Sequence, residues 1–118
     1  MNTREIGTRY EKEAAEFLEK KGYKILEMNF RGRNAEADII AKDGNTYVFV
    51  EVKYRLSAGS GHPLEAVTYA KQRKVSAAAL YYMSIHKLAP DAVSIRFDVI
   101  GIEGSEITHI ENAFYYTR

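Results

Sequence analysis

Val48-Phe49-Val50-Glu51-Val52-Lys53 has the composition of a β-strand, because β-branched and aromatic residues follow one another. Apolar residues on both faces are typical of a strand in the middle of a covered sheet. Side chains alternate along a strand, so Glu51 and Lys53 share one face with Phe49, and the three valines take the other. Charged groups on a buried strand are costly unless they are paired or bind a metal. The stretch therefore predicts a central strand that carries a functional site.

A second acid, Asp38, lies on the preceding apolar run, and residues 35–42 are predicted to form a strand. Asp43-Gly44-Asn45 is a turn signal of the kind that closes hairpins. If Gly44 and Asn45 form the loop, Asp38 faces Glu51 directly. If Asp43 and Gly44 form the loop, the two acids stay on the same face of the sheet as diagonal neighbours. A three-residue loop would put them on opposite faces unless a bulge corrected it.

Like charges side by side destabilise a sheet, so a divalent cation explains the pair of Asp38 and Glu51 better than a structural role does. Oxygen ligands are those that Mg²⁺ and Mn²⁺ prefer, and the chain has no cysteine. The three histidines, His62, His86 and His109, are isolated from one another, which argues against a zinc centre. The predicted cofactor is therefore Mg²⁺ or Mn²⁺.

A third acid, Glu11, lies on the inward stripe of a helix predicted from Thr3 to Lys21 and closed by Gly22. Gly7, one turn earlier, leaves room beside it. Glu11 is then either a neighbour of the acid pair or a glutamate at the edge of the stripe that reaches solvent. The sequence leaves these two interpretations level.

Two lysines accompany the acids. Lys53 either forms an ion pair at the strand end or supplies a cation that orients water and offsets charge on a phosphate. Lys71 falls inside the apolar arc of a helix predicted from Leu64 to His86, an arc that also carries Tyr81 and Ile85 and is predicted to face the core. Its amine either reaches the site or a phosphate, or stays in water while its stem covers the core edge. The role of the next residue, Gln72, is open.

The remaining elements complete an α-β-β-β-α-β-β order within a single domain, 1–118. Further strands are predicted at 23–30, 46–54, 93–102 and 106–110. The predicted fold is α/β, a central mixed sheet flanked by helices. Ser57 to Pro63 is rich in Gly and Ser and is predicted to be a mobile loop, which either closes over bound nucleic acid or is a plain connection.

The composition fits a folded protein of 118 residues, with 46% hydrophobic and 28% charged residues. No apolar run approaches the roughly 20 residues that cross a membrane. The start lacks the apolar core of a signal peptide, so we expect a cytoplasmic protein. A net charge of +1 argues against a strongly basic nucleic-acid binder. A nuclease with acids at its centre can nevertheless be nearly neutral overall.

Several motifs resemble those of the PD-(D/E)XK nuclease superfamily, whose core is α-β-β-β-α-β. Nearly the whole chain resembles the bacterial YraN family, which is similar to archaeal Holliday junction resolvases. The matching segments are Gly7-x-x-x-Glu11, Asn29-Phe30-Arg31, Glu36-Ala37-Asp38-Ile39-Ile40, Phe49-Val50-Glu51-Val52-Lys53, Lys71, Arg96-Phe97-Asp98-Val99 and Asn112-Ala113-Phe114.

The resemblance implies a role for each site residue. Asp38, Glu51 and the Val52 carbonyl would be metal ligands, and Glu11 a ligand directly or through water. Lys53 would be the catalytic lysine, beside Asp38 and Glu51 as catalytic acids. The chain departs from the family pattern at one position, because Ala35 stands where the family usually has glycine.

The leading functional hypothesis is a Mg²⁺-dependent DNA endonuclease, a phosphodiester hydrolase selective for branched or junction DNA. The alternatives are a nucleic-acid-binding module with little or no nuclease activity and a non-catalytic interaction protein. A homodimer is left open. The residues expected to contact nucleic acid are Arg31, Arg33, Arg55, Lys71, Gln72 and Arg73.

Overall fold

The computed structural model describes residues 3–55 and 67–118, so the predicted loop Ser57–Pro63 lies outside the described residues. The described residues follow the predicted order of a helix, three strands, a helix and two strands. No helix in these two ranges is long and apolar enough to cross a membrane. The elements are α1 (Thr3–Lys20), β1 (Lys24–Gly32), β2 (Ala35–Asp43), β3 (Thr46–Arg55), α2 (Tyr69–Ile85), β4 (Ser94–Glu103) and β5 (Glu106–Ile110).

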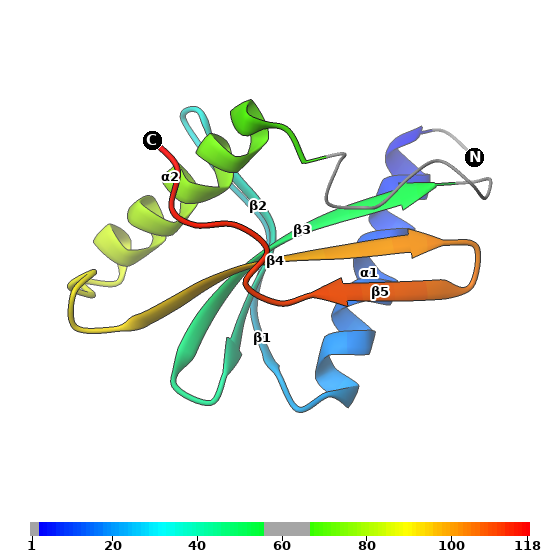
Figure 1. The fold of residues 1–118 in the computed structure, drawn as a ribbon, viewed down its shortest axis with the longest axis horizontal. Helices are drawn as coiled ribbons and strands as arrows, with labels where there is room; N and C mark the ends of the chain where they lie inside the picture. The colour runs from blue at the N-terminus through cyan, green and yellow to red at the C-terminus, as the bar shows by residue number, and fades with distance from the viewer. Residues whose placement is uncertain (1–2, 56–66) are drawn as a thin grey trace.

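The strands form one mixed sheet in the order β1-β2-β3-β4-β5 (Figure 1). β3 and β4 are parallel, and the other neighbours are antiparallel. The parallel pair follows from the connection between them, because a crossover that carries a helix returns the chain in the same direction. β3 therefore lies at the centre of the sheet, as the sequence predicts.

Each face of the sheet is covered by one helix, and Figure 1 shows α1 passing behind the strands. The three valines of β3 pack with Ala14 and Leu18 of α1. On the opposite face, Phe49 packs with Val75 and Tyr82 of α2. The alternation predicted for β3 is confirmed, and it directs Glu51 and Lys53 to the face of the sheet that α2 covers.

α1 ends at Lys20, one residue before the predicted end, and Gly22 closes it as predicted, in a backbone conformation that glycine adopts easily, with φ of +96°. The Tyr23 amide donates to the Leu18 carbonyl at 3.0 Å, and the Gly22 amide donates to the Glu19 carbonyl at 3.0 Å. This pair of bonds is a Schellman motif. It satisfies carbonyls at the helix end and turns the chain into β1.

α2 begins later than predicted. Val67 and Thr68 are not helical, and the predicted first residue, Leu64, lies outside the described residues. The Thr68 hydroxyl accepts a hydrogen bond from the Lys71 amide at 3.2 Å, which makes Thr68 the N-cap. This cap sets the helix start at Tyr69.

The inward face of α2 is also rotated from the predicted one. Ala79 and Met83 are buried, whereas Tyr81, predicted to face inward, is 45% exposed. The alanine-rich middle of the helix gives a weak periodicity, so packing decides the rotation. Tyr81 instead lies over β1, where a Cβ on Gly32 would be only 2.7 Å from its ring. The glycine permits this close contact between α2 and β1.

Candidate active site

The β2–β3 hairpin brings the two predicted acids together. Asp43 pairs with Thr46 across a Gly44-Asn45 loop, which is the first of the two predicted registers. The register continues to Ile39 opposite Val50. Asp38 and Glu51 are the next position along the two strands, beyond the last backbone pair, and therefore lie next to each other.

Asp38 occupies the point at which β2 and β3 stop pairing. Its side chain is buried, with 8% of the residue exposed. Carboxylate Oδ2 accepts a hydrogen bond from the Val52 amide at 2.8 Å. A side chain thus replaces a backbone carbonyl as the acceptor for a strand amide. The substitution fixes the Asp38 carboxylate beside β3.

Glu51 is the most poorly satisfied acid in the described part of the chain. Only 2% of the residue is exposed, and Oε2 has no hydrogen-bond partner among the described residues. Burial, followed by the negative charge of Asp38 and a hydrogen bond with its carboxyl group, raises the pKa of Glu51 to about 10. Two buried carboxyl groups that compete for one proton offer oxygen atoms to a divalent cation. Together with the Val52 carbonyl, this donor set fits Mg²⁺ or Mn²⁺.

Lys53 follows on the same face of β3 and is partly exposed. Its positive charge acts to lower the pKa of Glu51, against the larger effect of burial. Its amine is therefore close enough to influence the acid pair. The predicted spacing of two residues along the strand is confirmed, because successive β3 side chains alternate between the two core clusters.

Glu11 approaches the pair from α1 and lines a polar pocket of about 370 Å³ with Gly7, Thr8, Asn29 and Arg31. Burial raises the pKa of Glu11, a hydrogen bond with Asn29 opposes that rise, and the charge of Asp38 adds to it. Among the described residues, no three His, Cys, Asp or Glu side chains converge closely enough to hold one metal ion. The described residues therefore do not place Glu11 with Asp38 and Glu51 as three direct ligands of one ion.

Lys71 lies beside the acid pair rather than in open water. Its amine forms a close ion pair with Glu36 and lies 3.7 Å from Glu51 Oε1. The latter distance is too long for a hydrogen bond. Arg31 Nη1 contacts the other oxygen of Glu36 at 2.6 Å. Burial, then the charges of Lys74 and Arg31, lower the pKa of Lys71. Glu36 thus links two of the predicted DNA-contacting cations, a role that the sequence analysis did not assign.

The other predicted contact residues lie in different places. Arg33 and Arg73 are exposed and line a second hollow, whose described lining does not include Asp38 or Glu51. Arg55 is the last residue of β3 and pairs with Glu103 of β4. The Gln72 side chain contacts the backbone before α2, where its amide nitrogen donates a hydrogen bond to the Val67 carbonyl at 3.2 Å.

The departure at Ala35 introduces no backbone strain. The left-handed conformation in the β1–β2 turn falls on Asn34, with φ of +53°. Asparagine tolerates this conformation better than most residues do. Ala35 itself is buried as the first residue of β2.

A third buried acid, Asp98, was not predicted as part of a site. Asp98 of β4 is fully buried and accepts hydrogen bonds from Arg96, His109 and the Asn112 amide. One signal for it was present in the sequence, because Arg96 and Asp98 are two residues apart on a predicted strand and so share a face. His109, which looked isolated in the sequence, comes from β5, adjacent to β4.

Comparison with known proteins assigns the family. Residues 10–102 match the model of "Uncharacterised protein family UPF0102". A UPF0102 protein of Thermodesulfovibrio yellowstonii is 52% identical over 111 residues, covering 94% of this chain and 96% of the relative. One of Caldicellulosiruptor saccharolyticus is 48% identical over 120 residues, covering 97% of this chain and 100% of the relative. The chain therefore belongs to the UPF0102 family, the YraN family that its motifs resemble.

Proposed function

We propose that this protein is a Mg²⁺- or Mn²⁺-dependent endonuclease that hydrolyses phosphodiester bonds in DNA. The observation that carries the proposal is the buried pair of Asp38 and Glu51, in which Glu51 Oε2 has no partner among the described residues. A carboxylate oxygen is costly to bury without a partner. A cation held by the pair removes that cost.

Each residue has a distinct task in this proposal. Asp38 and Glu51 hold the cation with the Val52 carbonyl, and the Val52 amide keeps the Asp38 carboxylate in place. When bound, the cation supplies Lewis-acid chemistry, activating water and stabilising negative charge on the phosphate. Lys53 orients the attacking water and offsets charge on the phosphate as the bond breaks.

The surroundings of the acid pair favour a phosphate-containing substrate. Arg31 and Lys71 lie beside the pair, and both are partly neutralised by one acid, Glu36. An arriving phosphate can exchange places with the Glu36 carboxylate and take over these cations. The resemblance to junction resolvases extends the proposal to branched DNA as the preferred substrate.

The test is cleavage of branched, flapped and single-stranded DNA in Mn²⁺ and in Mg²⁺. We expect cleavage by the parent protein and a loss of at least about 100-fold in Asp38→Asn and Glu51→Gln, because removing stabilisation of developing charge has effects of this size. Lys53→Met should lose activity and keep metal binding, since Lys53 is not a ligand.

Glu106→Gln is the matched control for Glu51→Gln, because Glu106 is exposed at the β4–β5 turn. It should cleave as the parent does. A parent that binds Mn²⁺ through Asp38 and binds DNA without cutting any substrate would instead favour the binding-module alternative. A parent that binds neither would favour the interaction protein.

A further inference from the structure

Two hollows adjoin on the outer side of α2, where the C-terminal segment passes along the helix. The first has a volume of about 480 Å³ and is lined by Arg33, Arg73, Lys74 and Arg118 among its polar residues. The second, of about 540 Å³, has a mainly apolar lining. The two share Leu80, Tyr116 and Arg118, so they form one continuous groove.

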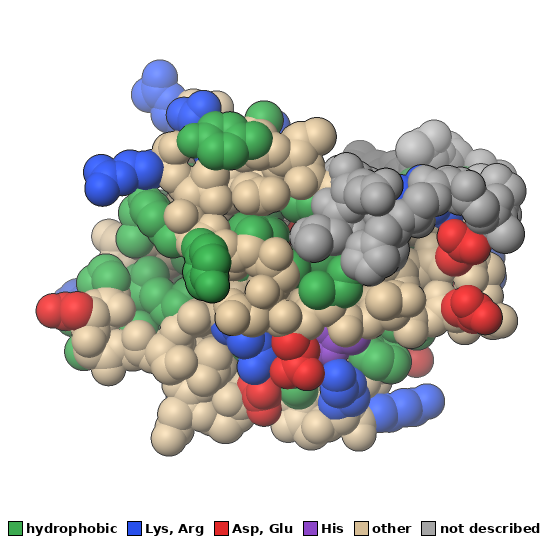
Figure 2. Space-filling model, in the orientation of Figure 1, with side chains coloured by type: hydrophobic (Ala, Val, Ile, Leu, Met, Phe, Trp, Pro, Cys, Tyr) green, Lys and Arg blue, Asp and Glu red, His purple; other side chains and the backbone are tan. Residues whose placement is uncertain are grey.

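The first hollow gathers positive charge that the protein does not neutralise. Its described lining contains four basic side chains and no Asp or Glu side chain. None of the four forms an ion pair with an acidic side chain within residues 3–55 and 67–118. Figure 2 shows Lys and Arg side chains gathered at the α2 end of the molecule, with hydrophobic side chains beside them. Cations held together in this way favour an anionic ligand.

The second hollow offers aromatic and apolar surface. Tyr116, at the junction of the hollows, is 48% exposed, and its neighbour Tyr115 is 84% exposed. Phe97, Phe114 and Met83 line the interior. Nucleic-acid bases stack on exposed aromatic rings, but only bases that are not enclosed in a duplex can do so. The hollow therefore fits an unpaired base.

The segment that carries Tyr116 is held against α2 at several points. The Thr117 amide donates to the Ser76 hydroxyl at 2.9 Å, and the Tyr69 hydroxyl donates to the Arg118 carbonyl at 2.7 Å. The Thr117 hydroxyl contacts Gln72 Oε1 at 3.4 Å. These bonds hold the backbone of the two residues that follow Tyr116 against α2, so binding would not have to order this part of the segment.

The groove begins next to the candidate active site. Lys71, which lies 3.7 Å from Glu51, precedes Arg73 and Lys74 on α2. Arg31 occupies the end of β1, two residues before Arg33. Lys71 and Lys74 are one turn apart on α2, so the cations at the acid pair and those in the first hollow come from the same two parts of the chain, α2 and the end of β1 with its turn.

We infer that this groove binds a single-stranded segment of the nucleic acid, with its phosphates in the basic hollow and an unpaired base on Tyr116. The inference rests on the proposed function and narrows its substrate class to nucleic acid with an unpaired arm. A flap or a splayed junction provides such an arm, whereas a blunt duplex does not.

The primary experiment measures binding of a labelled 15-nucleotide oligothymidylate by fluorescence anisotropy in EDTA, so that no cleavage is needed. Tyr116→Ala should weaken binding about 5- to 100-fold, as expected for loss of one stacked base. Tyr116→Phe, which keeps the ring, should bind within about twofold of the parent. Thermal melting of each variant verifies that it is folded.

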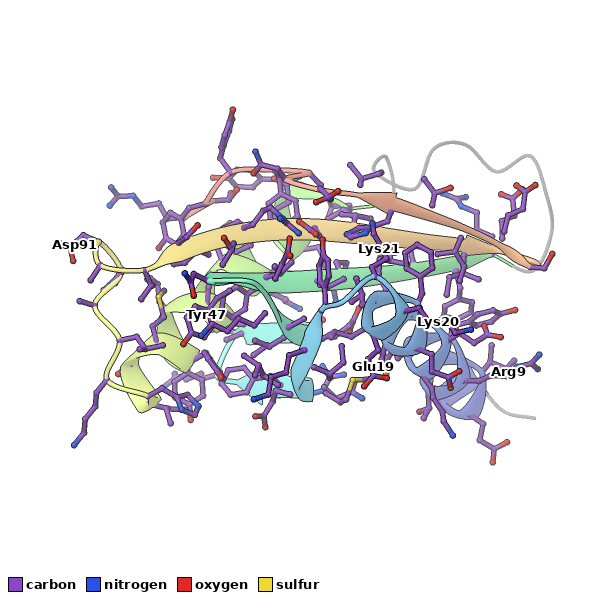
Figure 3. All side chains as sticks on the ribbon, turned by 90° about the horizontal axis from the view of Figure 1, so that it is seen from below. Arg9, Glu19, Lys20, Lys21, Tyr47 and Asp91 are labelled. Atoms are coloured by element: carbon purple, nitrogen blue, oxygen red, sulfur yellow. The ribbon has the colours of Figure 1, made fainter. Side chains whose placement is uncertain are left out.

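A second pair of variants tests the basic hollow without changing the ring. Arg73→Ala combined with Lys74→Ala should reduce the slope of log affinity against log salt by about 1.4, since each phosphate contact to a single strand contributes about 0.7. The control is Lys20→Ala combined with Lys24→Ala. Lys20 is on α1 (Figure 3) and Lys24 begins β1, at the end opposite the β1–β2 turn. This control should keep the parent's slope.

Two results would overturn the inference. One is a Tyr116→Ala variant that binds the oligonucleotide as tightly as the parent. The other is a parent that binds a blunt duplex as tightly as the single strand and loses both equally in Tyr116→Ala. Hydrolysis of bis(p-nitrophenyl) phosphate with Mn²⁺, compared between the parent and Asp38→Asn, tests the proposed function separately. Loss of hydrolysis in Asp38→Asn with unchanged oligonucleotide binding in Tyr116→Ala would reject the groove and keep the nuclease.

Discussion

Asp98 and the pair of Asp38 and Glu51 are buried acids on neighbouring strands, and their surroundings differ completely. Asp98 accepts two hydrogen bonds from Arg96, at 2.9 and 3.0 Å, and further ones from His109 and the Asn112 amide. Glu51 has one carboxylate oxygen with no partner in the described part of the chain. The first acid is satisfied by the protein, and the second is not.

The pKa values of these acids move in opposite directions. Burial acts to raise the pKa of Asp98, but the hydrogen bonds from His109, Arg96 and Asn112 outweigh it and lower the pKa. Burial and the charge of Asp38 raise the pKa of Glu51 to about 10. Burial alone therefore does not identify a functional acid. The supply of donors separates Asp98, whose carboxylate the protein satisfies, from Glu51, whose carboxyl group keeps an oxygen without a partner in the described part of the chain.

The largest effect is expected from Asp98→Asn. Loss of this charge leaves the partly buried Arg96 guanidinium without its main partner, which should cost about 3–5 kcal/mol of unfolding free energy. The melting temperature should fall by roughly 12–20 °C for a domain of this size. Thermal and urea unfolding in EDTA measure the change. A loss below about 1 kcal/mol would mean that the cluster around Asp98 does not stabilise the fold.

The second largest effect is expected from metal binding, which should depend on Asp38 and Glu51 and not on Asp98. At a Mn²⁺ concentration of 100 times its dissociation constant, the parent should gain about 2.7 kcal/mol of unfolding free energy. Asp38→Asn and Glu51→Gln should lose most of this gain, because each lacks a ligand. Asp98→Asn should keep it despite its lower starting stability. An equal gain in all four proteins would place the metal elsewhere.

The pH dependence of the metal-free protein should follow from Glu51. Folded Glu51 keeps its proton up to a pH of about 10, whereas the unfolded chain releases it near the ordinary value of 4.5. The stability that neutral Glu51 contributes to the folded state is fully present below a pH of 4.5. It is lost as the pH rises towards about 10. One pKa unit corresponds to about 1.4 kcal/mol. Between pH 5 and about 9, the parent should therefore lose at least about 1.4 kcal/mol more than Glu51→Gln.

Urea unfolding of both proteins at several pH values in EDTA measures this difference. Glu106→Gln is the control for removing a carboxylate, since that side chain is exposed. Parallel pH profiles for the parent and Glu51→Gln would show that Glu51 titrates as an ordinary carboxyl group in the folded protein.

The smallest effect is expected from Asp38→Asn in EDTA. Removing the charge of Asp38 takes away one of the causes that raise the pKa of Glu51, and the asparagine oxygen can still accept from the Val52 amide. The unfolding free energy should stay within about 1 kcal/mol of the parent value or rise. The same substitution thus has opposite consequences at positions 38 and 98. A large loss at position 38 would assign Asp38 a structural role and remove the main support for a metal site.

Much of the candidate site follows from local patterns. The alternation along Val48–Lys53 and the Gly44-Asn45 turn predict that Asp38 and Glu51 share a face, and the observed register agrees with one of the two predicted. Other features could not be read in this way. The face of α2 depends on how Tyr81 fits over Gly32, and the start of that helix depends on the Thr68 cap.

The sequence by itself determined the order of the elements, the central position of β3, the side-by-side acids and the family. These features depend on residues close together in the chain, where the strand and helix periods and turn chemistry act. Only the tertiary structure decided which donors reach each acid. Arg96 donates hydrogen bonds to the Tyr23 hydroxyl, 73 residues away in the chain, and to the Asp43 carboxylate, 53 residues away. The Asn112 amide donates to Asp98, 14 residues away. Such contacts form when strands and helices pack, and no local period encodes them.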